Sequence, residues 1–212
     1  MSERLDRLRR ALADERGGRV VFASHCLLNQ NVRYLGGATR AGAVDEFVDR
    51  CRVAGVGVVQ MPCPEQRAWG GVCKRYTLPV YGADRTCWRL VRRPATWLVL
   101  AHTRLVYRRL AARVAGQIAE YICSGYQVEA VVGIAGSPSC AVRTTLDLPA
   151  VLDALARTDP AGLDRHHLNQ RIIAAHAQPG EGMFIAALRD RLRRRGLRVA
   201  LDEHDLIADI SR

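Results

Sequence analysis

Lysine is almost absent from this chain, and aromatic residues are few. Of the 32 Lys and Arg residues only Lys74 is a lysine, and Phe, Trp and Tyr together make up 6% of the sequence. The formal net charge of +11 therefore comes from arginine, which is spread among the expected helices. Nucleic-acid-binding modules instead interleave basic and aromatic side chains. We expect a weak, nonspecific affinity for polyanions, so nucleic acid is a possible but not a favoured partner.

Long hydrophobic runs are also missing. No apolar stretch reaches the roughly 20 residues that span a bilayer, and the N-terminus is charged instead of carrying the apolar segment of a signal peptide. The composition, 49% hydrophobic and 25% charged, is that of an ordinary globular protein. We therefore expect no membrane partner and a cytoplasmic location, and the sequence gives no indication of an oligomeric state.

Several well-known catalytic and nucleotide-binding motifs are missing as well. There is no Walker loop, no G-x-G-x-x-G after a strand and no G-x-S-x-G elbow. The seven cysteines are an odd number for a disulfide framework in a chain of 212 residues. Reduced, buried or metal-bound thiols are the better interpretation, and we expect Cys51, Cys87 and Cys123 to be structural.

Three short apolar runs each end in a cysteine. They are β-branched and flanked by turn-forming residues, which is typical of buried parallel strands; they cover residues 20–26 (VVFASHC), 56–63 (VGVVQMPC) and 130–140 (AVVGIAGSPSC). Ligands of open parallel sheets bind outside the carboxyl ends of the strands. Cys26, Cys63 and Cys140 should therefore converge at one edge. Three thiolates make an incomplete tetrahedral or cluster site with one position left for chemistry.

The rest of the pattern predicts a single α/β domain over residues 1–212, doubly wound around a mainly parallel sheet, with a cluster site at the C-terminal ends of the strands. Residues 17–140 form the expected core, and 141–212 a helical elaboration plus a last strand. The stretch 67–96, rich in Gly, Pro and Arg, has no clear periodicity. Helices are expected at 2–16, 43–54, 97–124, twice within 147–179, and at 181–195, with the fourth strand at 197–201.

Short motifs surround the three cysteines. They are Ser24-x-Cys26-Leu27-Leu28 with Val32-Arg33-Tyr34-x-Gly36, then Cys63-Pro64-Glu65 with Gly70-Gly71, then Ser137-Pro138-Ser139-Cys140. In this order and combination the chain, over roughly residues 19–140, resembles the 2-thiouracil desulfurase family and most of all its desulfidase relatives. Two places depart from the family pattern, since Val72-Cys73-Lys74-Arg75 replaces a Pro-Thr-Pro-Arg-like segment and Ala141 replaces a glycine.

The resemblance implies a cofactor and a reaction. The cofactor is a [4Fe-4S] cluster held by Cys26, Cys63 and Cys140, with the fourth iron free of protein ligands. The reaction is the non-redox, hydrolytic removal of sulfur from a thiolated nucleobase or a similar small thiocarbonyl. The residues of these motifs that we expect to contact the substrate are Asn29, Arg33, Gly70 and Gly71.

Two residues beside the cysteines are candidates for catalysis. Glu65 stands two residues after Cys63, where it could orient or deprotonate the attacking water. Ser137 stands three residues before Cys140 and could donate a hydrogen bond to the substrate or the leaving sulfur.

Other interpretations of the same residues remain open. Cysteines after strands are commonly packing residues, and Cys73 could close the site as a fourth ligand. Glu65 could be a capping carboxylate, Ser137 a turn residue, and Arg33 a partner of a backbone carbonyl. A different class of protein also fits: a three-cysteine metal-binding or redox-sensor protein whose basic surface contacts RNA or a protein partner.

Overall fold

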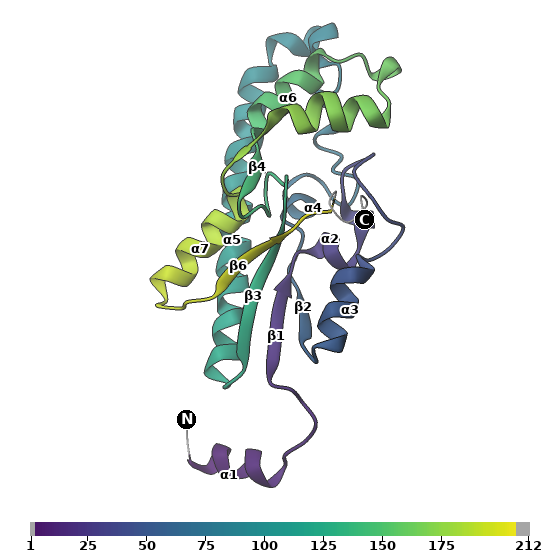
Figure 1. Ribbon diagram of the computed structural model, residues 1–212. Coiled ribbons are helices and arrows are strands. Elements are labelled where there is room, and N and C mark those ends of the chain that lie inside the picture. Colours follow the sequence, from purple (N-terminus) through teal and green to yellow (C-terminus); the bar gives the residue numbers. More distant parts are fainter. Residues whose placement is uncertain (1–2, 207–212) are drawn as a thin grey trace.

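A parallel four-stranded sheet organises the protein, as the computed structural model of residues 3–206 shows (Figure 1). Its strands are β1 (Arg19–Ala23), β2 (Gly57–Gln60), β3 (Gln127–Ile134) and β6 (Ala200–His204), in the order β2-β1-β3-β6. All three pairings are parallel. The prediction of an α/β fold with a mainly parallel sheet is confirmed, and the first three strands coincide with the apolar runs that precede the cysteines.

Helices cover both faces of this sheet. Side chains of β1 alternate between the faces: Phe22 packs with α5 (Arg92–Cys123) and α7 (Met183–Arg194), whereas Val21 packs with α3 (Asp45–Val53). The chain leaves β1 for β2 on one side and later crosses to β3 on the other. The strand order therefore reverses between β1 and β3, and such a reversal opens a crevice at the carboxyl ends of the strands.

The fourth strand begins three residues later than predicted. Leu197 lies in the turn that closes the C-terminus of α7, because its N–H donates to the carbonyl of Leu192 at 3.0 Å. Strand β6 then includes Asp202 and Glu203. These acidic residues have partners after β3: Glu203 Oε2 accepts the N–H groups of Val142 and Arg143, both at 2.8 Å, and Asp202 Oδ1 lies 3.2 Å from Arg143 Nη1.

A helical layer stands over the carboxyl ends of the strands. Helix α5 starts at Arg92 instead of the predicted position 97, and its N-terminal half extends beyond the sheet to lie beside α6 (Leu148–Arg157) (Figure 1). A short antiparallel pair, β4 (Thr144–Leu146) with β5 (Ala177–Pro179), occupies residues for which no strand was predicted.

Short elements complete the chain between residues 3 and 206. They are α1 (Glu3–Ala11), α2 (His25–Leu28), α4 (Pro64–Ala68), a π-helix (His167–Ile173) and the 3-10 turns Gln30–Val32, Leu78–Val80, Ala83–Arg85, Cys87–Leu90, Pro160–Gly162 and Ala174–His176. Within this described part of the chain, no helix combines the length and the apolar character needed to cross a membrane.

Candidate functional site

Cys26, Cys63 and Cys140 line one cavity of about 300 Å³ between the strand ends and the helical layer. Cys26 lies in α2 directly after β1, and Cys63 is the N-cap residue of α4 after β2. Cys140 lies in the loop after β3. The expected convergence of the three strand ends thus brings these side chains to a single cavity.

The loop that carries Cys140 is held by close backbone contacts on two sides. A Cβ at Gly133 in β3 would overlap the carbonyl oxygen of Cys140, and a Cβ at Gly182 would overlap the backbone of Ser139. The Ser139 carbonyl also accepts the N–H of Phe184 at 3.0 Å, in the first turn of α7. These contacts fix Cys140 against the end of β3 and the start of α7.

All seven cysteines are free thiols, and the three in the cavity have raised pKa values. Burial is the largest cause in each case, and it raises the pKa of Cys63 to about 12. The neighbouring thiolates of Cys26 and Cys63 raise the pKa of Cys140 further, although the Ser24 side chain opposes this rise. Without a positive partner these thiols are therefore protonated at neutral pH. Within residues 3–206, no group of three or more His, Cys, Asp or Glu side chains is placed to hold a metal ion.

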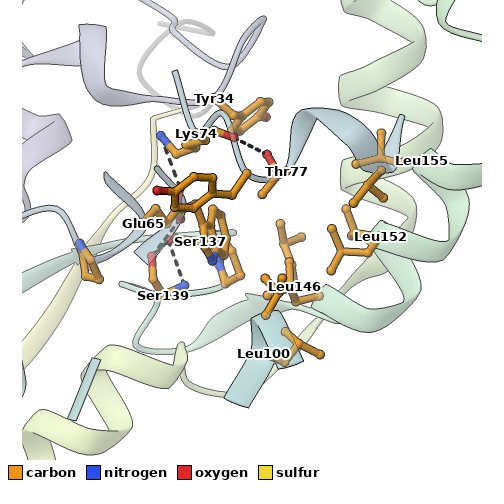
Figure 2. A pocket seen from close by; sticks show the side chains of 18 of the residues that line it. Tyr34, Glu65, Lys74, Thr77, Leu100, Ser137, Ser139, Leu146, Leu152 and Leu155 are labelled. Carbon is orange, nitrogen blue, oxygen red and sulfur yellow. Dashed lines mark hydrogen bonds and ion pairs between the residues drawn. The ribbon is translucent and has the colours of Figure 1, made fainter. Parts of the chain in front are cut away.

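A chain of polar groups runs along the cavity (Figure 2). The Ser139 hydroxyl donates to Glu65 Oε1 at 2.8 Å, and Lys74 Nζ lies 3.6 Å from Glu65 Oε2. The Ser137 and Ser139 hydroxyl oxygens are 3.1 Å apart. Since Ser139 donates to Glu65, its oxygen can accept the hydroxyl proton of Ser137. Glu65 and Ser137 thus belong to one hydrogen-bonded row.

Ser137 also acts as a turn residue. Its oxygen accepts the N–H of Cys140 at 3.0 Å and that of Ser139 at 3.3 Å. The turn interpretation is therefore correct. It is compatible with a catalytic contact, because the one hydroxyl proton of Ser137, which points to Ser139 in the row, can be turned to a bound ligand while the oxygen keeps accepting these N–H groups.

Lys74 is a functional candidate that the sequence analysis missed. Its side chain is 3% exposed, and its ammonium group donates to the carbonyl oxygen of Val32 besides facing Glu65. Its backbone is left-handed, with φ of 50°. The turn that presents it begins at Gly70 and Gly71, which also have positive φ and do not belong to the cavity lining. Substrate contact by these two glycines stays a prediction.

Arg33 and Asn29 differ in their distance from the cavity. Arg33 lines it, but its Nε donates to the carbonyl of Gly37 at 2.5 Å, as one of the alternatives had it. Asn29 is not a lining residue, and its side chain accepts the N–H of Asn31 at 3.0 Å. Arg33 can still reach a ligand with its remaining N–H groups.

Two hydroxyls near the thiols have no partner in hydrogen-bond geometry among residues 3–206. They belong to Ser24 and Tyr107, which are 1% exposed each. Ser139 is near enough to Tyr107 to lower its pKa, which burial and the charges of Glu65 and Cys140 raise, but the two hydroxyls do not meet in hydrogen-bond geometry. Unpaired buried hydroxyls are costly, so both can serve as donors to a group bound in the cavity.

The other four cysteines lie outside the cavity. Cys51 lies in α3 and is buried in the core, as expected of a structural residue. Cys87 and Cys123 are exposed, so they are not core packing residues. Cys73 is exposed too and does not line the cavity, which places it unfavourably for a fourth ligand.

Comparison with known proteins gives no relative for this chain. No family model, no curated protein and no solved structure matches it. Function is therefore inferred from the residues of the cavity.

Proposed function

We propose that this protein is a [4Fe-4S]-dependent, non-redox desulfidase that removes sulfur from a thiolated nucleobase or a similar small thiocarbonyl. The observation that carries the proposal is the composition of one cavity: Cys26, Cys63 and Cys140 line it together with Glu65 and Ser137. The free thiols of the proposed site imply a reducing compartment, and we place the protein in the cytoplasm.

The residues of the cavity fit a cluster. Three thiols are the protein ligands that leave one iron of a [4Fe-4S] cluster open, and the Ser24 and Tyr107 hydroxyls are unused donors for cluster or cysteine sulfur. The raised pKa values mean that the centre must displace thiol protons when it binds. When bound, the cluster supplies a Lewis-acidic iron that accepts the sulfur of the thiocarbonyl and polarises its C=S bond.

Glu65 is the residue that handles the water proton in this proposal. Its carboxylate is fixed on one side by Ser139 and faces the charge of Lys74 on the other. These two contacts hold the carboxylate at the cavity, where it can accept a proton from the attacking water. Ser137 donates its hydroxyl proton to the substrate or the leaving sulfur. In sum, the thiocarbonyl and water give a carbonyl and hydrogen sulfide, with no electron transferred.

The first experiment measures iron, zinc and sulfide after anaerobic reconstitution. We expect brown protein with about four irons and four sulfides per chain. Cys26→Ser should remove the cluster and the activity together, whereas Cys123→Ser, which alters an exposed thiol outside the cavity, should leave both unchanged. Stoichiometric zinc without iron uptake would contradict the cluster.

The second experiment tests the chemistry by sulfide release from 2-thiouracil or a thiolated nucleoside. Glu65→Gln keeps the shape of the side chain but not its basicity, so it should retain the cluster and lose about 10²–10⁴-fold in turnover. Ser137→Ala should cost less, as the loss of one donor. Full sulfide release by Glu65→Gln would eliminate Glu65 as the base, and an intact cluster without release from any thiolated base would contradict the substrate.

A second candidate function rests on a different surface. Arg104 and Arg108 of α5 line a groove with Arg191 and Arg194 of α7, although Asp190 pairs with Arg194 at 2.9 Å. This groove is where a three-cysteine metal-binding or redox-sensor protein would contact RNA or an acidic partner. RNA binding that falls steeply with salt and is lost in an Arg104→Gln/Arg108→Gln variant would favour this candidate.

A further inference from the structure

The cavity has an apolar end opposite its polar groups. In Figure 2, leucines from α5, β4 and α6 face the Glu65–Ser139 end across the open space. We call the following residues the apolar lobe: Leu100, Leu146, Leu148, Val151, Leu152 and Leu155. We propose that the apolar lobe binds the body of the substrate, which is a neutral, mainly apolar molecule whose thiocarbonyl reaches Glu65; this inference rests on the desulfidase function.

Two polar residues that line the cavity with the lobe, Arg92 and Tyr34, already have protein partners. Arg92 also lines the cavity, but its Nε lies 2.8 Å from Asp84 and another of its nitrogens 2.7 Å from Asp153. The Tyr34 hydroxyl donates to Asn169 at 2.6 Å. A charged ligand entering the lobe would therefore lose its hydration without gaining an ion pair from Arg92, whereas an apolar ligand would release water from leucine side chains.

The lobe narrows the class of substrate. A bare thiopyrimidine carries polar atoms around most of its ring, and the leucines and valine of the lobe offer these atoms no hydrogen bond. A thioamide or thiolactam with an alkyl or aryl body instead keeps its polar atoms together at one end. In its conversion, water supplies the oxygen of the new C=O bond, the C=S bond breaks, and the sulfur leaves as hydrogen sulfide with the two protons of water. No oxidant or reductant is consumed.

In this proposal, the segment after Cys140 recognises the body of the substrate. Strand β4 and helix α6 supply five of the six lobe residues, and α5 supplies Leu100. The polar groups come from the loops after β2 and β3. Recognition of the body and chemistry at the thiocarbonyl are thereby assigned to different segments of the chain.

Calorimetric binding to the metal-free protein tests this inference with lactams, which contain C=O in place of C=S and cannot lose sulfur. The probes are δ-valerolactam, its propyl, hexyl and phenyl derivatives, and uracil. We expect affinity to rise about fourfold per methylene until the lobe is full, and uracil to bind more weakly than hexyl-valerolactam. Affinity independent of chain length, or tighter binding of uracil, would overturn the inference.

Two variants locate the binding site. Ala95 of α5 lines the cavity, so Ala95→Phe should weaken binding of the hexyl lactam at least tenfold and spare δ-valerolactam. Ala101→Phe, on the same helix but outside the lining, is the matched control. If Ala95→Phe fails to fold, Leu155→Val enlarges the lobe and should move the best chain length upward. Equal hexyl-lactam affinity in Ala95→Phe and Ala101→Phe, or an unmoved optimum in Leu155→Val, would place the ligand elsewhere.

The same probes separate this inference from the desulfidase function. In one outcome, lactam binding depends on chain length while the corresponding thiolactams release no sulfide. That result would contradict the desulfidase function and support the apolar binding site. Sulfide release from 2-thiouracil, together with a lactam affinity that does not depend on chain length, would support the desulfidase function and contradict substrate binding in the apolar lobe.

Discussion

Lys74 Nζ and Glu65 Oε2 lie 3.6 Å apart in the interior, where the two side chains are 3% and 13% exposed. Lys74 is the only lysine in a chain whose positive charge is otherwise carried by arginine. A lysine ends in a compact point charge, whereas an arginine presents a wide planar fork. The cation beside Glu65 is therefore the more compact ammonium group of a lysine and not the wider guanidinium group of an arginine.

Replacing Lys74 by methionine should weaken both the fold and the catalysis. Breaking a buried pair leaves an uncompensated charge, and we expect a loss of about 3 kcal/mol in the free energy of unfolding. Without the ammonium group the Glu65 carboxylate loses one of its two fixed contacts, so kcat of the proposed reaction should fall while KM changes little. Urea unfolding and steady-state kinetics measure the two effects. If kcat of Lys74→Met equals that of the wild type, Lys74 does not act through Glu65.

Substitution of Gly182 should disrupt the loop that carries Cys140. A Cβ at this position would overlap the Ser139 backbone, and overpacking of this kind costs about 1–3 kcal/mol. Gly182→Ala should therefore lower the urea midpoint and slow the uptake of iron. Gly116→Ala is the control: Gly116 lies within α5, a Cβ there meets nothing within 4 Å, and alanine is the better helix former by about 1 kcal/mol. Equal stabilities of the two variants would contradict the close contact.

Tyr107→Phe should have opposite effects on the metal-free and the loaded protein. The Tyr107 hydroxyl is buried without a partner, so its removal should stabilise the metal-free protein by about 1 kcal/mol. In the proposed cluster-loaded protein the same hydroxyl would donate to sulfur, and its loss should shorten the lifetime of the cluster in air. Thermal unfolding and the decay of the brown colour report the two effects. A cluster as durable in Tyr107→Phe as in the wild type would mean that the hydroxyl does not reach it.

The metal-free protein should lose stability in alkaline solution. A thiol whose pKa is raised on folding stabilises the fold fully below its ordinary pKa of 9.0, and for Cys63 this contribution is lost as pH rises toward about 12. One such group changes the free energy of unfolding by about 1.4 kcal/mol per pH unit in that window. Urea unfolding from pH 7 to 11 should show a shallower decline in Cys63→Ala than in the exposed-site control Cys123→Ala. Parallel declines would show that Cys63 is not buried as a thiol.

The strands and the meeting of the three cysteines at one cavity could be predicted because both follow from local patterns. Short β-branched runs form buried parallel strands, and the carboxyl ends of such strands share an edge. The hydrophobic patterns that predict helix α3 and strand β1 are each complete within a few consecutive residues. The start of α5 was predicted too late because its first turn holds Arg92, Arg93 and Pro94 in place of apolar residues at helical spacing.

The helical layer and the apolar lobe could not be predicted, since they arise from contacts between distant segments. The stretch 67–96 forms 3-10 turns, whose length is too short to show a periodicity. Strands β4 and β5 have three residues each. The burial of Lys74 depends on a left-handed turn and on the Val32 carbonyl from another element. The only feature of the sequence that could have drawn attention to Lys74 is that it is the single lysine of the chain.

The packing of the α7 N-terminus on the Ser139–Cys140 backbone determines when, during synthesis, the site can be finished. Chains fold from the N-terminus as they emerge from the ribosome, and a nascent chain that has reached only residue 181 contains all three cysteines. Yet its third cysteine still lacks the Gly182–Phe184 segment that fixes its loop. The proposed cluster, which needs all three thiols, could therefore be inserted only after the Gly182–Phe184 segment has emerged, later than the last of its three cysteines.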